Sequence, residues 1–114
     1  MDTIITITEK EMDEFLKVSK GWVKQISGYE YVYDYSLPRY PIVVKVLSTI
    51  SVPNSPRKNR GSNVIRIYAV KVDVHGKVIC GLMKSTRIRV VPGWQSEVYE
   101  TVISVIQKAK NMIG

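Results

Sequence analysis

Hydrophobic positions along the chain predict a helix near each end. Between residues 9 and 25 apolar side chains recur at helical spacing, behind a capping box in which Thr8 is followed by Glu11. After Pro92 and Gly93 a single apolar stripe returns at the same spacing: Val98, Val102, Val105, Ile106, Ala109 and Met112. We therefore expect a first helix over about Glu9–Gln25 and a second that begins near Ser96.

The segment between these helices predicts four strands. Alternating or continuously apolar runs mark Tyr29–Ser36, Ile42–Ile50, Val64–Val74 and Lys77–Val91. The last two form a hairpin around His75-Gly76, a two-residue turn with glycine in second place. The expected fold class is α+β: one domain over residues 1–114, with a four-stranded antiparallel meander and both helices on one sheet face.

The hairpin register assigns side chains to the two faces of the sheet. With Val74 opposite Lys77, the predicted core face gathers Ile65, Ile67, Ala69, Val78, Cys80, Leu82, Ile88 and Val90. The other face gathers Arg66, Tyr68, Met83, Ser85, Arg87 and Arg89. Lys71 and Lys84 misfit on the core face, and a bulge near Gly81 would move one of them.

The strand Tyr29–Ser36 places four tyrosines, at positions 29, 31, 33 and 35, on a single face. Three interpretations stay open: a packed ladder in the core, a sheet edge that pairs two subunits into a homodimer, and a surface for stacking.

Composition indicates a globular protein of one core. The chain has 114 residues, 45% of them hydrophobic and 24% charged. The single cysteine, Cys80, forms no internal disulfide and fits a reducing compartment as a small core residue. With no membrane-spanning apolar run and no signal peptide in the sequence, we expect a cytoplasmic location and no membrane partner.

The net charge of +7 is unevenly distributed. Residues 1–36 hold seven acids and four lysines, whereas residues 37–114 hold thirteen bases and three acids. The loop SVPNSPRKNRGSN, residues 51–63, contains Arg57, Lys58 and Arg60 without an acid. A basic region of this kind favours a polyanionic partner through counterion release.

The chemistry of single-stranded nucleic acid matches the residues of this region. Unpaired bases stack on aromatic rings while cations follow the phosphates. The candidate phosphate contacts are Arg57, Lys58, Arg60, Arg66, Arg87 and Arg89, and the candidate stacking residues are Tyr68, Tyr33 and Trp94. Each of these features also has a structural interpretation when it is taken alone. The tyrosines fit a packed ladder, the sheet arginines fit a solvated outer face, and the basic loop fits a flexible polar turn.

Catalytic and metal-binding patterns are weak. The one histidine, His75, lies in the predicted turn, and no second histidine or cysteine is present to build a zinc site. No glycine-rich loop precedes a helix. We expect no enzymatic activity and no cofactor.

The stretches VVKVLSTI, RGSNVIRIYAV and STRIRVVPGW resemble a pattern in small phage and microbial proteins. There a "TSI" strand precedes a glycine-led "AIRV" strand, an arginine-bearing strand and a final helix. The plan is also similar to ThermoDBP, an archaeal single-stranded-DNA-binding family. The resemblance covers about residues 42–110 and implies DNA binding with little sequence preference, through a cleft lined by aromatic and basic residues.

These observations favour a non-enzymatic protein that binds single-stranded nucleic acid, DNA more than RNA. The alternative is a small protein-interaction module, for example a mobile-element protein that binds an acidic host partner. Steep salt dependence with any oligonucleotide indicates the first, and binding to a single protein indicates the second.

Overall fold

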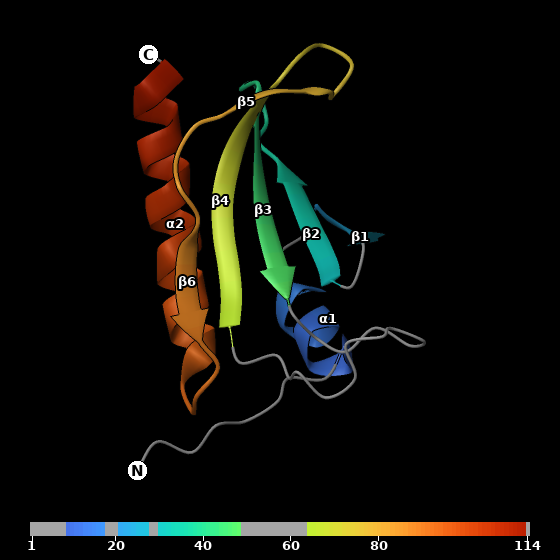
Figure 1. Cartoon of the computed structure of the whole chain (residues 1–114), viewed down its shortest axis with the longest axis vertical. Helices are drawn as coiled ribbons and strands as arrows, with labels where there is room; N and C mark the ends of the chain where they lie inside the picture. The colour runs from blue at the N-terminus through green and yellow to red at the C-terminus, as the bar shows by residue number, and fades with distance from the viewer. Residues whose placement is uncertain (1–8, 18–20, 28–29, 49–63, 114) are drawn as a thin grey trace.

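The computed structural model describes residues 9–17, 21–27, 30–48 and 64–113 (Figure 1). The helices and strands, in chain order, are α1 Glu9–Lys17, β1 Trp22–Ser27, β2 Glu30–Ser36, β3 Ile42–Ser48, β4 Val64–Val72, β5 Val78–Gly81, β6 Thr86–Arg89 and α2 Trp94–Ile113. This is the expected α+β fold, with a short helix and a long helix around an antiparallel sheet.

All the strand pairs of the sheet are antiparallel. The order is β1-β2-β3-β4, and the far edge of β4 is shared by β5 and β6. β5 pairs with the Val70–Val72 end of β4, and β6 pairs with its Val64–Ile67 end. Both short strands thus lie along one long strand.

Both helices pack on the same face of the sheet, as predicted. Alternate strand residues, among them Tyr31, Val44, Val46, Ile65 and Ile67, form one buried cluster with side chains of α1 and α2. The helices meet where Phe15 contacts Trp94 edge to face, with ring centroids 5.1 Å apart. Burying each of these large apolar side chains contributes roughly 1.5–3 kcal/mol. Neither described helix packs on the opposite face of the sheet, which we call the open face.

The first helix ends at Lys17, so the predicted range to Gln25 is wrong. Trp22–Ser27 is an edge strand that pairs with β2, from Trp22 opposite Tyr35 to Ser27 opposite Glu30. Gly21 precedes it at φ 108°, where a Cβ atom would come within 2.9 Å of the Tyr35 ring. Because glycine alone tolerates both conditions, Gly21 allows β1 to begin beside Tyr35.

The sheet built by the described residues therefore has six strands rather than four. The extra edge strand β1 also places the tyrosine strand inside the sheet, between β1 and β3, so that strand is not an edge for pairing subunits. Tyr31 and Tyr33 are buried under the helices and Tyr35 is partly buried, which agrees with a packed ladder.

The predicted last strand is divided into β5 and β6 by residues 82–85. At Val70 and Lys71 the predicted register holds, with Gly81 and Cys80 opposite them, but next to the turn Val72 lies opposite Val78, one residue from the predicted pairing. Along β6 the register is shifted by two residues, so that Arg66 lies opposite Arg87. Because side chains alternate with a period of two, a shift of two residues leaves the residues of β6 on their predicted faces. The prediction for Met83 is wrong, because its side chain packs against the core cluster instead of lying on the opposite face.

The turn between β4 and β5 is longer than predicted. Asp73, rather than Val74, lies opposite Lys77, and the Asp73 carboxylate accepts hydrogen bonds from the backbone N–H of His75 and of Lys77. Gly76 has φ 82°, the left-handed conformation that closes such a three-residue turn. A further irregularity lies between Lys71 and Val72.

Cys80 is exposed, so its prediction as a core residue is wrong. All four residues of β5, Cys80 among them, are exposed. Lys84 is exposed as well, and Lys71 is half-buried near the end of β4.

The second helix begins at Trp94, two residues before the expected start. Val98, Val105 and Ala109 of the predicted stripe are buried, whereas Met112 is exposed near the end of the helix. Neither helix in the described ranges is long and apolar enough to cross a membrane.

Candidate nucleic-acid interface

Three arginines gather on the open face where β4 and β6 pair. Arg66 lies directly opposite Arg87, and Arg89 lies opposite Val64. Their neighbours Ile65, Ile67 and Ile88 are buried under the helices, so the alternation of side chains directs the arginines to the open face. Arg87 and Arg89 are exposed, and the Arg66 side chain is 33% exposed. We call Arg66, Arg87 and Arg89 the arginine cluster.

The cluster places like charges opposite one another. Cross-strand pairs of this kind are destabilising unless an anion lies close by. Arg66 has such a partner, because its guanidinium forms an ion pair with the Glu30 carboxylate of β2. Among the described residues, no carboxylate lies within ion-pair distance of Arg87. Arg87 is therefore the member of the cluster that we consider open to an external anion.

Tyr68 lies beside the arginine cluster on the open face. It is two residues from Arg66 along β4 and directly opposite Lys45 on β3. Its half-buried side chain packs against three buried valines, at positions 43, 70 and 72. Part of this ring stays accessible on a sheet surface next to cations, which is the setting of a base-stacking residue.

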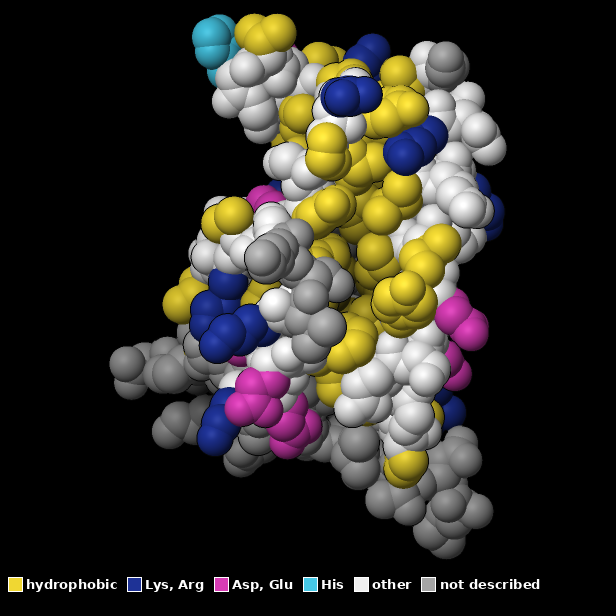
Figure 2. Space-filling view, turned by 180° about the vertical axis from the view of Figure 1, so that it is seen from behind, with side chains coloured by type: hydrophobic (Ala, Val, Ile, Leu, Met, Phe, Trp, Pro, Cys, Tyr) yellow, Lys and Arg dark blue, Asp and Glu magenta, His cyan; other side chains and the backbone are white. Residues whose placement is uncertain are grey.

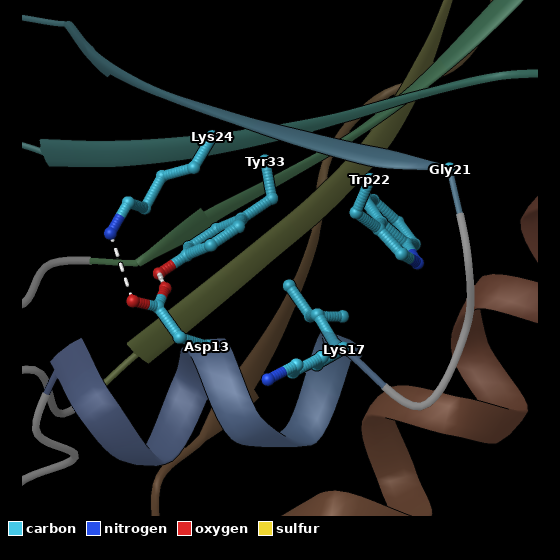
Figure 3. Close-up of a pocket in the computed structure, with 7 residues that line it drawn as sticks. Asp13, Lys17, Gly21, Trp22, Lys24 and Tyr33 are labelled. Atoms are coloured by element: carbon cyan, nitrogen blue, oxygen red, sulfur yellow. Dashed lines mark hydrogen bonds and ion pairs between the residues drawn. The ribbon is translucent and has the colours of Figure 1, made fainter.

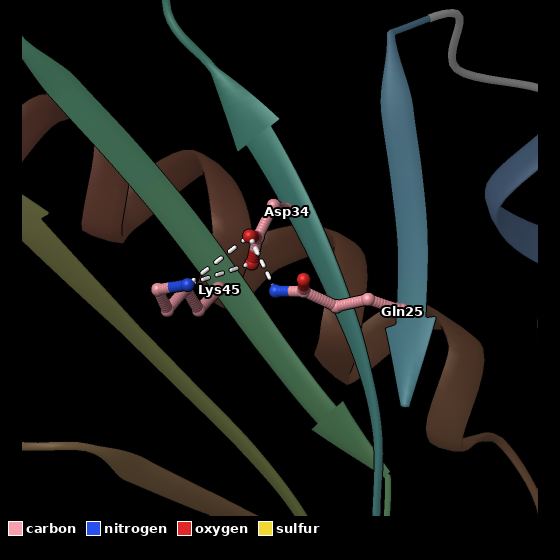
Figure 4. Close-up of polar contacts among 3 residues, drawn as sticks. All are labelled: Gln25, Asp34 and Lys45. Atoms are coloured by element: carbon pink, nitrogen blue, oxygen red, sulfur yellow. Dashed lines mark hydrogen bonds and ion pairs between the residues drawn. The ribbon is translucent and has the colours of Figure 1, made fainter. Parts of the chain in front are cut away.

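The open face of β1–β3 carries a paired polar group instead (Figure 4). Lys45 Nζ lies 3.0 and 3.1 Å from the two carboxylate oxygens of Asp34, and Gln25 donates to the same carboxylate at 3.0 Å. Asp34 thus neutralises Lys45. The sequence-based candidate site did not include Lys45, Glu30 or Asp34, although alternation along β2 already predicts that Glu30 and Asp34 lie on the face opposite the tyrosines.

Tyr33 and Trp94, both predicted as stacking residues, are each only 2% exposed. Trp94 packs against Phe15 in the core. Tyr33 points toward α1, where its hydroxyl donates a 2.6 Å hydrogen bond to Asp13 (Figure 3). Neither ring presents a face to solvent, so neither is available to a base in this structure.

The Asp13 side chain links α1 to two strands of the sheet, β1 and β2. Besides Tyr33, it contacts Lys24 of β1, whose Nζ lies 2.8 Å from its second oxygen. Burial raises the pKa of the Asp13 carboxyl, but hydrogen bonds from Lys24 and Tyr33 and the charge of Lys24 outweigh burial, so its pKa lies below the ordinary value. A cavity of about 440 Å³ adjoins this contact, lined also by Leu16, Lys17, Gly21 and Trp22. Because Asp13, Tyr33 and Lys24 satisfy one another, we interpret the contact as structural.

Arg57, Lys58 and Arg60 lie outside the described residues. The chain leaves β3 at Ser48 and enters β4 at Val64, and Ser48 pairs with Ile65. Both ends of the basic segment are therefore attached at the end of the sheet that carries the arginine cluster.

The described residues contain no group of three or more His, Cys, Asp or Glu side chains placed to hold a metal ion. His75 is exposed at the tip of the β4–β5 turn.

No protein-family model, curated protein or solved structure matches this chain. The resemblance to ThermoDBP stays a prediction from the sequence pattern, and the case for function rests on the geometry of the open face.

Proposed function

We propose that this protein binds single-stranded nucleic acid, DNA in preference to RNA, with little sequence specificity and without catalysis. The supporting observation is the arginine cluster, in which Arg66 and Arg87 lie opposite one another on a sheet face that neither described helix covers. A phosphate near Arg87 would offset the repulsion between these two guanidinium groups, a gain that no described side chain supplies to Arg87.

Tyr68 directs the proposal toward single strands. A stacking ring requires a base that is unpaired, whereas phosphate contacts alone are made equally well by a duplex. The helices offer no alternative for duplex binding, because α2 exposes Glu97, Glu100 and Gln107 along its length and gains bases only from Lys108 onward. Neither described helix presents a basic face to a major groove.

The strand is expected to follow β4 and β6 rather than cross the whole sheet. On the open face, β4 and β6 carry arginines without an acid, whereas β2 carries Glu30 and Asp34. Phosphates near β2 would meet these carboxylates. The basic segment 51–63, which joins β3 to β4 at the arginine end, adds three further candidate contacts.

A fluorescence-anisotropy titration tests this function. The labelled ligands are single-stranded DNA, single-stranded RNA and duplex DNA of the same length, about ten nucleotides, each at two salt concentrations. We expect the single strand of DNA to bind most tightly and affinity to fall steeply with salt. Tighter binding of the duplex at equal salt would contradict the stacking contribution, and no binding of any ligand at low salt would contradict the function.

A protein-interaction module is the second candidate, and exposed apolar side chains favour it. Val23 and Ile26 of β1 and Val78 and Ile79 of β5, at opposite edges of the sheet, are each at least about half exposed. Figure 2 shows a band of hydrophobic side chains that continues along the molecule between charged groups. In the titration above, this candidate predicts that no oligonucleotide binds.

A further inference from the structure

A second pocket lies between α2 and the edge of the sheet, on the opposite side of β6 from the arginine cluster. Its volume is about 310 Å³. Its lining includes one residue of the segment between β5 and β6, one of β6 and four of α2: Met83, Thr86, Glu100, Thr101, Ser104 and Lys108. β6 runs alongside α2 at this point (Figure 1).

Helical spacing explains the composition of the α2 wall. Positions 100, 101, 104 and 108 recur on one side of a helix with 3.6 residues per turn, next to the buried Val105 and Ala109. The buried Val105 contributes to the lining, together with Met83, which packs against the core. The pocket thus combines an apolar part with a row of polar side chains.

The polar side chains of the pocket have no partners among the described residues. Neither a hydrogen bond nor an ion pair within the described ranges involves the side chain of Thr86, Glu100, Thr101, Ser104 or Lys108. Thr101 and Ser104 are half-buried. Several converging polar groups beside an apolar surface are typical of a small ligand site. The Asp13 contact near α1 differs, because its polar groups pair with one another.

We infer that this pocket receives one nucleobase with an amino group at the 4-position of a pyrimidine or the 6-position of a purine, which is cytosine or adenine. The inference rests on the proposed function. The ring would lie against Val105 and the Met83 thioether, which makes favourable contacts with aromatic rings. The Glu100 carboxylate accepts hydrogen bonds from an amino group but repels the carbonyl oxygen that uracil and thymine present at the same position. Lys108 would contact an adjoining phosphate.

The position of the pocket supports this occupant. Thr86 and Arg87 are consecutive in β6, so their side chains point to opposite faces at the same sheet edge. To place one base in the pocket, a strand bound at Arg87 would turn around this edge of the sheet, from the open face to the side of α2. The discrimination adds a modest base preference to an affinity that the phosphates dominate.

The test compares two pyrimidines that carry an amino or a carbonyl group at the 4-position. Oligonucleotides of about ten deoxycytidines and about ten deoxyuridines differ there and at N3, which accepts a hydrogen bond in cytosine and donates one in uracil, and both lack the methyl group of thymine. At pH 8, where cytosine is neutral, we expect the cytidine strand to bind roughly threefold more tightly, because the charged hydrogen bond is only partly shielded from water. A strand of deoxyadenosines is compared in the same way with a strand of deoxyinosines, because these purines carry an amino and a carbonyl group at the 6-position.

The variant Glu100→Gln should remove the ratio between the two strands, because an amide serves amino and carbonyl groups equally. Glu97→Gln is the matched control: it removes the same charge from an exposed position of α2 outside the pocket, so both affinities rise slightly and the ratio persists. Equal affinities in the unaltered protein, or a ratio that survives Glu100→Gln, would overturn the pocket assignment alone. Failure of every strand to bind would remove the proposed function and the pocket together.

Discussion

On the open face, Asp34 of β2 pairs with Lys45 of β3, whereas Arg66 of β4 and Arg87 of β6 stand opposite one another. Lys45 is held by Asp34 at 3.0 Å, and Gln25 adds a third group to that network. Arg87 instead faces Arg66. Both halves are built from antiparallel strand pairs, and they differ in how their charges are placed. Internal pairing of charges contributes to folding, whereas Arg87, which has a like charge opposite it and no carboxylate within ion-pair distance among the described residues, retains attraction for an external anion.

The largest expected effect is on the free energy of unfolding, where the buried Trp94 should differ from the half-buried Tyr68. Trp94→Ala should lower the free energy of unfolding by about 3–5 kcal/mol, because it removes a buried ring and leaves a cavity. Tyr68→Ala should cost clearly less, because that ring is half-buried on the open face. Urea denaturation measures both. An equal loss of stability for the two variants would mean that Tyr68 belongs to the core.

For the affinity for single strands, the half-buried Tyr68 should matter although it contributes less than Trp94 to stability. Tyr68→Ala is expected to weaken single-strand binding by about 1–3 kcal/mol if a base stacks on its ring. Tyr99→Ala is the matched control, since Tyr99 is 60% exposed on α2 and lies away from the open face. Anisotropy titrations with the same oligonucleotide compare them. If both variants bind as the unaltered protein does, Tyr68 is not a stacking residue.

Removing the ion-pair partner of Arg66 should have a smaller effect on the affinity for single-stranded DNA. Glu30→Gln removes the carboxylate that pairs with Arg66 and is expected to tighten binding by roughly two- to fivefold, in line with an ion pair of below about 1 kcal/mol. Asp34→Asn removes an equal charge from the paired network of β2 and β3 and should tighten binding less. A larger gain in affinity for Asp34→Asn than for Glu30→Gln would contradict the proposal that nucleic acid binds along β4 and β6 rather than along β2 and β3.

The smallest effect concerns acid stability and involves the helix face. The pKa of Asp13 is lowered in the folded protein, so the unfolded chain binds this proton more tightly. The resulting stabilisation is complete above the unfolded pKa of about 4 and is lost as the pH falls through the folded value. Asp13→Asn should therefore flatten the decline of stability in acid, measured by urea denaturation between about pH 5 and pH 2. An unchanged decline would assign the acid sensitivity to other carboxylates.

Local alternation was sufficient to predict the face of each arginine. The register along β6 differs from the expected one by two residues, yet Arg66, Arg87 and Arg89 keep their face because the period of a strand is two. The helix–strand error at β1 has an equally local cause. Trp22 and Ile26 are four residues apart, a spacing that fits both one helix face and one strand face.

Long-range contacts were beyond the sequence pattern. The Glu30–Arg66 ion pair joins residues 36 positions apart and depends on the registers of three strands. The burial of Tyr33 depends on which face of β2 the helices cover, and alternation does not specify that choice. Trp94 was predicted as a stacking residue and the helix was expected to begin near Ser96, whereas the first turn of α2 includes Trp94 and packs it on Phe15.

The salt dependence of binding tests most directly whether the arginines of β4 and β6 hold the phosphates. The double variant Arg87→Ala with Arg89→Ala is compared with Lys10→Ala with Lys17→Ala, which removes the same charge from exposed positions on α1. For single-stranded DNA, the slope of log affinity against log salt should become shallower by roughly 0.7 for each phosphate that the arginine variant no longer neutralises, and should stay unchanged in the lysine variant. Equal slopes in the two variants would contradict the account, because total charge rather than the arginine cluster would then govern binding.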